Sequence, residues 1–446
     1  MFRNLPRRLG AAILAAVLSH APAWAQDVAA QHGRLDQLRE FSYLAPSHTL
    51  AELRKLKPQV GQWPQRDQAA YYSLLSNVLR GTDSGAALQA AETEERIGRQ
   101  LGDESIVANS LLDRAYVKSV QGEDEAATLA LAMAHQMAQQ TKDLAMQAKT
   151  TITSGQDAIR QGNGRKGLEH MDRAVTLANA SNQPVIQFMA LRARALALSG
   201  LAGEGQQALK AVDALKAKAA AIPLDGIAIR ASYTEWQIAD EAGQLARARS
   251  ALAEVVAWLQ KHRMNEMVPR LQVSLADFSL RSQDYKEALR LSRESKQAGH
   301  AAGDTLAIET SQFNEGIALI YLGQLEEGRS IVEAANFDYI DAEALLEYAR
   351  ALDYVGQKEF ALKVFARASR KLQDDTSAEA QLQKKNRENE ELLRQKDDKA
   401  KDLRNAENVQ RIWSMVAAVG VLVLLVLAFL SRKLWLANLK LKGDRP

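Results

Sequence analysis

The sequence has 446 residues with 57 basic and 54 acidic side chains, which gives a formal net charge of +3. This near balance provides no strongly basic surface of the kind that nucleic-acid binding requires, so no nucleic-acid partner is expected. The absence of cysteine excludes disulfides, thiolate metal sites and a thiol nucleophile. The seven histidines are scattered, with no pair at the spacing of two ligands on one helix face, and we predict no metal site.

The first residues have the layout of a secretory signal peptide. Three arginines lie within the first eight residues, a short apolar core follows, and Ala23 to Ala25 form a small-x-small cleavage pattern. The apolar core is too short to span a bilayer. We therefore predict a signal peptide over residues 1–25 and an exported chain that begins at Gln26.

Residues 26–373 have the pattern of paired helices. Ala- and Leu-rich stretches alternate with short Gly, Asp or Asn breaks, and strand-like alternation is nearly absent. A turn residue recurs at a nearly constant interval, and only the last interval is clearly shorter. These turn residues are Gly122, Gly162, Gly203, Gly243, Gln283, Gly323 and Gly356. Such a period is typical of a solenoid built from helical hairpins.

A small residue follows each turn residue by five positions, as expected where two helices cross closely. These residues are Ala127, Gly167, Ala208, Ala248, Ala288, Gly328 and Ala361. The segments Asn314–Ala335 and Tyr348–Ala368 resemble tetratricopeptide (TPR) repeats in the placing of their Gly, Ala and Leu residues. The resemblance implies an all-α, TPR-like solenoid with repeats of about 40 residues; another type of α-hairpin solenoid is the alternative. Further hairpins are expected over residues 35–57 and 67–102, which gives about eight or nine units.

Stacked hairpins form a curved rod whose concave face is lined by the first helix of each hairpin. On the helix before Gly243, four side chains share one face, and two more occupy equivalent places one repeat later. These candidate ligand-binding residues are Arg230, Tyr233, Gln237 and Asp240, followed by Arg270 and Asp277. We predict that they contact a protein or peptide ligand. The alternative is a solvated charged face without a partner.

A single membrane span is predicted over residues 412–430. This stretch contains no charge, and as a helix it would be about 28 Å long, close to the hydrocarbon thickness of a bilayer. The basic tail, residues 431–446, indicates a cytoplasmic C-terminus. We expect the span to lie in a bacterial inner membrane and the bulk of the chain to lie in the periplasm.

The segment between the solenoid and the span, residues 374–411, is strongly charged and carries a sparse heptad pattern. It is predicted to form a helical neck. One possibility is a single charged helix that continues into the membrane. The other is a weak coiled coil that pairs two copies of the chain into a homodimer.

This order of parts resembles the input half of bacterial TPR-containing sensor proteins. A signal peptide, an exported repeat region, the charged stretch Asn386–Arg394 and one span are arranged as in transmembrane diguanylate cyclases and, secondly, in sensor histidine kinases. The resemblance implies that a ligand outside the membrane alters pairing inside. Residues 431–446 contain no GGDEF signature, so the chain as given is not expected to be an enzyme.

No Gly-rich phosphate loop, Ser-His-Asp arrangement or His-Glu cluster occurs in the sequence, so we predict neither catalytic residues nor a cofactor. The expected function is that of a membrane-anchored periplasmic protein that binds protein or peptide ligands as the sensory part of a signalling protein. One alternative is a periplasmic scaffold or assembly factor without transmembrane signalling. The second alternative is a truncated diguanylate cyclase whose GGDEF domain lies beyond the given chain.

Overall fold

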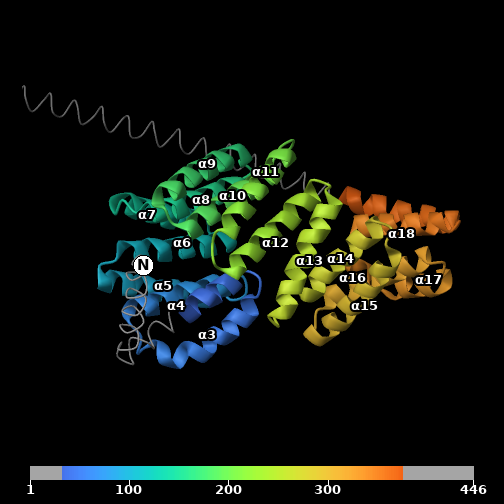
Figure 1. Cartoon of the computed structure of the whole chain (residues 1–446), viewed down its shortest axis with the longest axis horizontal. Helices are drawn as coiled ribbons and strands as arrows, with labels where there is room; N and C mark the ends of the chain where they lie inside the picture. The colour runs from blue at the N-terminus through green and yellow to red at the C-terminus, as the bar shows by residue number, and fades with distance from the viewer. Residues whose placement is uncertain (1–32, 375–446) are drawn as a thin grey trace, which may run out of the picture. The chain divides into compact units, whose positions relative to one another are not determined.

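The computed structural model describes residues 33–374, and all regular secondary structure in that range is helical (Figure 1). The predicted signal peptide (1–25), the neck beyond Asp374, the span (412–430) and the tail (431–446) lie outside the described residues. Between residues 33 and 374, none of the helices combines the length and the apolar character that a membrane crossing needs. The helices belong to one compact unit that ends at Gln373.

Within the described residues, the helices form nine antiparallel pairs. The first helices of the pairs are residues 33–41, α4 (Gln65–Leu79), α6 (Glu104–Val120), α8 (Leu144–Arg160), α10 (Pro184–Ser199), α12 (Asp225–Glu241), α14 (Val268–Arg281), α16 (Thr305–Tyr321) and α18 (Ala342–Tyr354). The second helices are α3 (Pro46–Val60), α5 (Ser84–Leu101), α7 (Asp124–Gln140), α9 (Gly164–Ser181), α11 (Gly205–Ala220), α13 (Leu245–Lys261), α15 (Tyr285–Ala302), α17 (Leu325–Ala334) and residues 358–374. The predicted all-α hairpin solenoid is confirmed for this part of the chain.

Aspartate side chains begin many of these helices. Asp83, Asp103, Asp143 and Asp304 each accept a hydrogen bond from a backbone N–H in the first turn of the helix that follows. A carboxylate at this position satisfies a donor that has no partner within the helix and favours the positive end of the helix dipole. The Asp-rich breaks in the sequence are therefore helix starts.

The seven turn residues that set the period all have left-handed backbone conformations. Their φ angles lie between 62° and 86°, with Gln283 at the lower limit. A side chain at such a φ crowds the backbone, which explains why six of the seven positions hold glycine. Gln283 is the exception, and its local conformation costs about 1 kcal/mol relative to glycine.

The small residues five positions after the turns lie where the two helices of a pair cross. In the pair α16–α17, a Cβ placed on Gly328 would lie 2.6 Å from the carbonyl oxygen of Gly316. In the pair α8–α9, a Cβ on Gly167 would lie 2.9 Å from the carbonyl oxygen of Gly155. Real Cβ atoms essentially never come this close to backbone. The close approach inferred from the sequence is confirmed at these crossings.

The shorter last interval, from Gly323 to Gly356, reflects a shortened second helix. Helix α17 has 10 residues, whereas α15, the second helix of the preceding pair, has 18. A short 3-10 helix, η1 (Phe337–Tyr339), then leads toward α18. The missing residues therefore come from the end of α17.

An N-terminal stretch, Glu40–Ser47, packs against helices that come much later in the chain (Figure 1). We call it the closing segment. Its apolar residues Phe41, Leu44 and Ala45 join a buried cluster with side chains of α10 to α14. The ring of Phe41 lies 5.5 Å from that of Trp258 on α13. This contact joins the first helical pair to helices in the middle of the solenoid, so the described helices before α13 form one closed superhelical turn.

Polar contacts hold both ends of the closing segment. At one end, the backbone N–H of Gly226 donates to a carboxylate oxygen of Glu40 over 3.2 Å. At the other end, both the backbone N–H and the hydroxyl of Ser47 donate to the carboxylate of Glu266, over 2.9 and 2.6 Å. These contacts fix the position of the residues between them.

Candidate ligand-binding surface

The predicted ligand-binding residues on α12 contact the closing segment. The guanidinium carbon of Arg230 lies 5.1 Å from the ring centre of Tyr43 and 5.7 Å from that of Phe188. The ring of Tyr233 meets that of Tyr43 edge-on at 5.7 Å. The sequence pattern had indicated a strip that faces a ligand; in the structure, part of that strip faces a segment of the same chain.

Arg192 on α10 completes this contact, although the sequence pattern did not single it out. One of its terminal nitrogens donates to the hydroxyl of Tyr43 over 2.6 Å, and its Nε donates to the hydroxyl of Thr234 over 3.0 Å. Its guanidinium carbon lies 4.6 Å from the centre of the Tyr43 ring. Tyr43 is therefore held by two guanidinium groups, one from α10 and one from α12.

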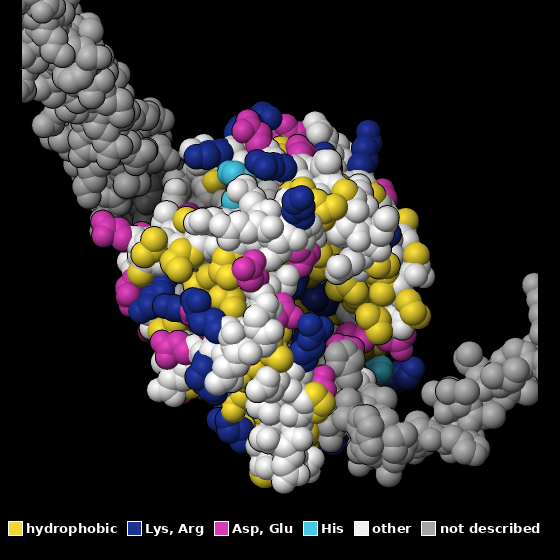
Figure 2. Space-filling view, turned by 90° about the vertical axis from the view of Figure 1, so that its left-hand side faces the viewer, with side chains coloured by type: hydrophobic (Ala, Val, Ile, Leu, Met, Phe, Trp, Pro, Cys, Tyr) yellow, Lys and Arg dark blue, Asp and Glu magenta, His cyan; other side chains and the backbone are white. Residues whose placement is uncertain are grey.

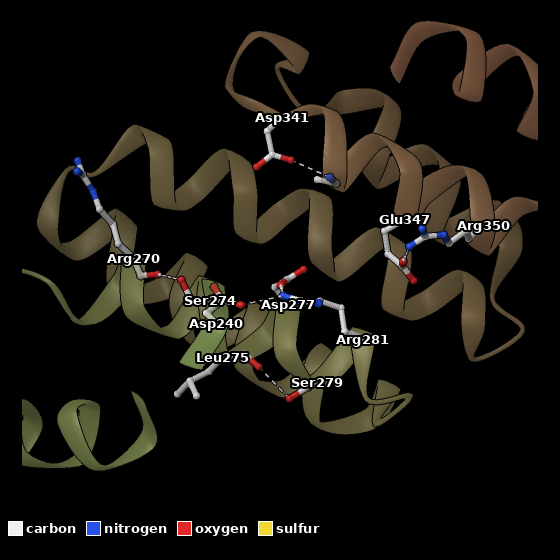
Figure 3. Close-up of polar contacts among 11 residues, drawn as sticks. Asp240, Arg270, Ser274, Leu275, Asp277, Ser279, Arg281, Asp341, Glu347 and Arg350 are labelled. Atoms are coloured by element: carbon white, nitrogen blue, oxygen red, sulfur yellow. Dashed lines mark hydrogen bonds and ion pairs between the residues drawn. The ribbon is translucent and has the colours of Figure 1, made fainter. Parts of the chain in front are cut away.

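The remaining α12 candidates continue along the helix. The side-chain oxygen of Gln237 is buried without a hydrogen-bond partner among the described residues. Asp240 lies 3.3 Å from Arg281, which also lies 3.3 Å from Asp277 on the same helix, α14 (Figure 3). Burial raises the pKa of Asp277 to about 6, although Arg281 opposes this shift. Arg281 thus forms ion pairs with two of the predicted residues, Asp240 and Asp277.

Arg270 does not belong to this group. Its side chain points away from Asp277 in Figure 3 and pairs with Asp304 over 2.6 Å. Asp304 is the residue that caps α16, so this ion pair links the starts of two consecutive first helices. Arg230 and Arg270 therefore occupy the same position in their repeats, as the sequence indicated. Their contacts differ, because Arg230 lies on aromatic rings and Arg270 pairs with a carboxylate.

A second polar network joins α4, α6 and α8. Ser73 donates to Asp113 over 3.4 Å, and Lys149 donates to the side-chain oxygen of Asn109 over 3.3 Å. Both pairs are separated by 40 positions, the repeat period itself. The amide nitrogen of Asn109 also donates to Ser73 and to Glu94. A search for polar residues at the repeat spacing would have found Ser73, Asn109, Asp113 and Lys149.

Three ionisable groups of this network have pKa values that differ from their ordinary ones. Burial raises the pKa of Glu94 well above its ordinary value, and the nearby charge of Asp113 adds to the shift. Burial also raises the pKa of Asp113 to about 6, with Arg80 and Lys149 acting in the opposite direction. Burial, together with Arg39, lowers the pKa of Lys149. Both carboxyl groups therefore take up a proton at a higher pH than they would in water.

Side chains from helices that are not neighbours in the chain influence one another here. Burial and the charge of Arg192 lower the pKa of Arg230 to about 10, and Arg80, at the end of α4, contributes in the same direction. Arg39 similarly acts on Lys149 of α8. First helices α4, α6, α8, α10 and α12 contact one another in this order, and Tyr43 joins the first pair to α10 and α12, so this row of helices curves around a common space. Figure 2 shows a hollow at this end of the described region with Lys and Arg side chains inside it.

A separate open groove of about 800 Å³ lies near the start of α14. Glu266, which holds Ser47 of the closing segment, lines it together with Gln272 and small residues of α15. The side-chain oxygen of Gln272 is buried without a hydrogen-bond partner among the described residues. The end of the closing segment therefore contacts a residue of the groove wall.

Metal and catalytic sites gain no support from the described part of the chain. Between residues 33 and 374, no group of three or more His, Asp or Glu side chains is arranged to hold a metal ion. The three buried carboxyl groups with raised pKa values, Glu94, Asp113 and Asp277, each have a hydrogen-bond or ion-pair partner. The arrangement is suited to binding polar and charged groups.

No protein-family model matches the sequence, and no curated protein matches it as a relative. Among solved structures, one similar protein is a signal-transduction ATPase with a tetratricopeptide repeat sensor from Pyrococcus horikoshii, with a TM-score of 0.50 and 11% identity. The match covers 76% of this chain and 54% of that one, so this chain spans about half of its length.

Two other similar structures are matched over nearly their whole length. A Rap protein complexed with competence and sporulation factor has a TM-score of 0.46 and 12% identity, with 78% of this chain and 98% of that chain covered. Aspartyl phosphate phosphatase F from Bacillus subtilis has a TM-score of 0.47 and 12% identity, with 76% and 94% covered. At these identities the likeness concerns the fold alone. In its fold, this chain is a TPR-like helical-repeat protein.

Proposed function

We propose that this protein binds an extended segment of another polypeptide in the hollow enclosed by first helices α4 to α12. The observation that carries this proposal is the seating of the closing segment. Arg192, Arg230 and Tyr233 already hold a piece of polypeptide through hydrogen-bond and ring contacts with Tyr43. The same types of contact recognise peptides in grooves lined by helices.

The rest of the hollow offers further groups to such a ligand. Ser73, Asn109 and Lys149 come from three consecutive first helices and form a polar row across three successive repeats. An extended peptide presents backbone N–H and C=O groups at regular intervals, which such a row can match. The structural neighbour from Pyrococcus horikoshii is described as having a TPR sensor, and we assign the solenoid of this chain a comparable recognition role.

The rest of the proposal, a membrane anchor and a sensory role, is based on the sequence. The signal peptide (1–25), the span (412–430) and the basic tail (431–446) favour an inner-membrane protein with a periplasmic solenoid. The charged neck favours a sensory role, in which ligand binding outside changes pairing near the membrane, as in the input half of a transmembrane diguanylate cyclase. Protease added to spheroplasts should digest the solenoid, and full protection would contradict this orientation.

The binding proposal is tested with a phage-displayed library of linear peptides on the full chain in nanodiscs. Peptides that are enriched should bind saturably in calorimetry when synthesised. Substitution of Lys149→Gln together with Arg192→Gln should weaken that binding by about tenfold or more. The matched control is Arg165→Gln, because Arg165 is 75% exposed and pairs with Glu204 on the outside. A library without enrichment, or peptides that bind the double variant as tightly as the unchanged protein, would refute the proposal.

A further inference from the structure

The arginines of the hollow differ from most arginines at the other repeat contacts. On α13, α14 and α15, Arg247, Arg281 and Arg293 each lie within 3.3 Å of a carboxylate oxygen. In contrast, no carboxylate among residues 33–374 forms an ion pair with Arg80, Arg192 or Arg230. Their partners are aromatic rings and hydroxyl groups.

Two of these three arginines contact the same ring, and the third acts on the charge of one of them. Arg192 and Arg230 lie on the same ring, that of Tyr43, and Arg80 is near enough to contribute to the electrostatics of Arg230. The Nε of Arg230 is buried and has no hydrogen-bond partner among the described residues. Like charges held together and partly removed from water destabilise a fold unless something neutralises them. Arrangements that oppose stability in this way are typical of binding sites.

The nearest acidic groups supply only part of the missing charge. Asp113 hydrogen-bonds to Ser73, and Glu94 hydrogen-bonds to Asn109, both on the side of the hollow formed by α4 to α8. The charges of Arg80 and Lys149 both act on Asp113, so this one carboxyl group is shared between two cations. Arg192 and Arg230 lie on Tyr43 of the closing segment without a carboxylate partner among the described residues, and Arg80 shares Asp113 with Lys149, so positive charge is in excess here. We call these three residues the arginine cluster.

We propose that the arginine cluster recognises carboxylate groups of the bound peptide, so that the ligand is an acidic peptide. This inference rests on the proposed function and specifies its ligand. Guanidinium groups bind carboxylates with paired, charge-assisted hydrogen bonds, and an aromatic ring behind each guanidinium keeps it oriented. The three groups come from α4, α10 and α12, so they are suited to an elongated ligand with several acidic side chains.

The test uses short oligo-glutamate peptides with a fluorescent label and the full chain in nanodiscs. An amidated oligo-glutamate should bind, and an oligo-glutamine of equal length should bind at least about tenfold more weakly. Substitution of Arg192→Gln with Arg230→Gln should remove the difference, whereas Arg165→Gln should keep it. Arg80→Gln serves as a second variant should the double variant not fold, because the guanidinium of Arg80 lies over the ring of Tyr116, which is 38% exposed.

The outcomes separate this inference from the proposed function. Equal binding of oligo-glutamate and oligo-glutamine, or full binding of oligo-glutamate by Arg80→Gln and by the folded double variant, would overturn the acidic-peptide inference. Binding of the free-acid peptide but not of its amidated form would assign recognition to the C-terminal carboxylate, and would overturn the role of acidic side chains. In each case, peptides enriched from the library could still bind, and the proposed function would stand.

Discussion

The hydroxyl of Tyr43 accepts a hydrogen bond of 2.6 Å from Arg192, a residue 149 positions later in the chain. This contact joins the first helical pair to the fifth, so it closes a turn that neighbouring repeats alone would leave open. In a solenoid, each repeat ordinarily contacts its neighbours only. The closing segment therefore makes the stability of the first pair depend on helices in the middle of the chain.

Substitution of Tyr43→Phe should loosen this closure. The variant keeps the ring that both guanidinium groups contact but removes the acceptor for Arg192, which should cost about 1–2 kcal/mol of local stability. Hydrogen exchange of the amides in the closing segment should become faster, while exchange in α16 and α18 stays unchanged. Tyr339→Phe is the matched control, because Tyr339 is 44% exposed. Unchanged exchange in the closing segment would show that the ring contacts alone hold it.

Substitution of Gly328→Ala should destabilise the pair α16–α17. The added methyl would lie 2.6 Å from the carbonyl oxygen of Gly316, and backbone cannot move aside as a flexible side chain can. We expect a loss of about 2 kcal/mol in the free energy of unfolding measured by urea denaturation. Gly85→Ala is the control, since its nearest contact would be an ordinary 3.6 Å. The control should unfold at the same or a slightly higher urea concentration.

Substitution of Gln283→Gly should stabilise the protein. Gln283 has a φ of 62°, in the region where the other six turn positions have glycine. Removing the side chain should raise the free energy of unfolding by about 1 kcal/mol, because the left-handed conformation is strained for any L residue with a Cβ. The reverse change at an equivalent turn, Gly243→Gln, should lower it by a similar amount. Thermal unfolding of the two variants in opposite directions checks the prediction, and shifts of the same sign would contradict it.

The turns and crossings could be predicted from sequence because each depends on a local requirement. A left-handed φ favours glycine at Gly122 or Gly323, and a close crossing favours a small residue at Gly167 or Gly328, in every repeat alike. The requirement recurs with the period and becomes visible as a pattern. Gln283 was placed correctly by that period although it lacks the usual residue.

The closing segment could not be predicted in the same way. The contact between Tyr43 and Arg192 occurs once, so no repetition marks it, and its two residues are 149 positions apart. The pattern on α12 located Arg230 and Tyr233 on an inward face but could not show that Tyr43 covers them. Arg270 illustrates the converse case, because its repeat position matches that of Arg230 while its partner Asp304 has no counterpart there.

The polar network around Glu94 predicts a specific pH dependence. Glu94 is 3% exposed, and its pKa in the folded state is raised above the unfolded value of 4.5, chiefly by burial. The folded state therefore keeps a proton that the unfolded state has lost, so the free energy of unfolding falls as the pH rises from 4.5 through the raised pKa. Asp113 acts in the same direction, while Lys149 and Arg39 favour the charged form of Glu94.

Substitution of Glu94→Gln should remove the part of this dependence that comes from Glu94. Glutamine keeps an oxygen that can accept from Asn109, but it carries no charge that burial would penalise. In urea denaturation followed by circular dichroism, the variant should be more stable than the unchanged protein at pH 8 and equally stable below pH 4.5, the unfolded value of the Glu94 pKa. Glu125→Gln, at an exposed position on α7, should follow the unchanged protein at both pH values. A stability difference for Glu94→Gln that is the same at both pH values would mean that the pKa of Glu94 is equal in the folded and unfolded states, with Lys149 and Arg39 cancelling the effect of burial.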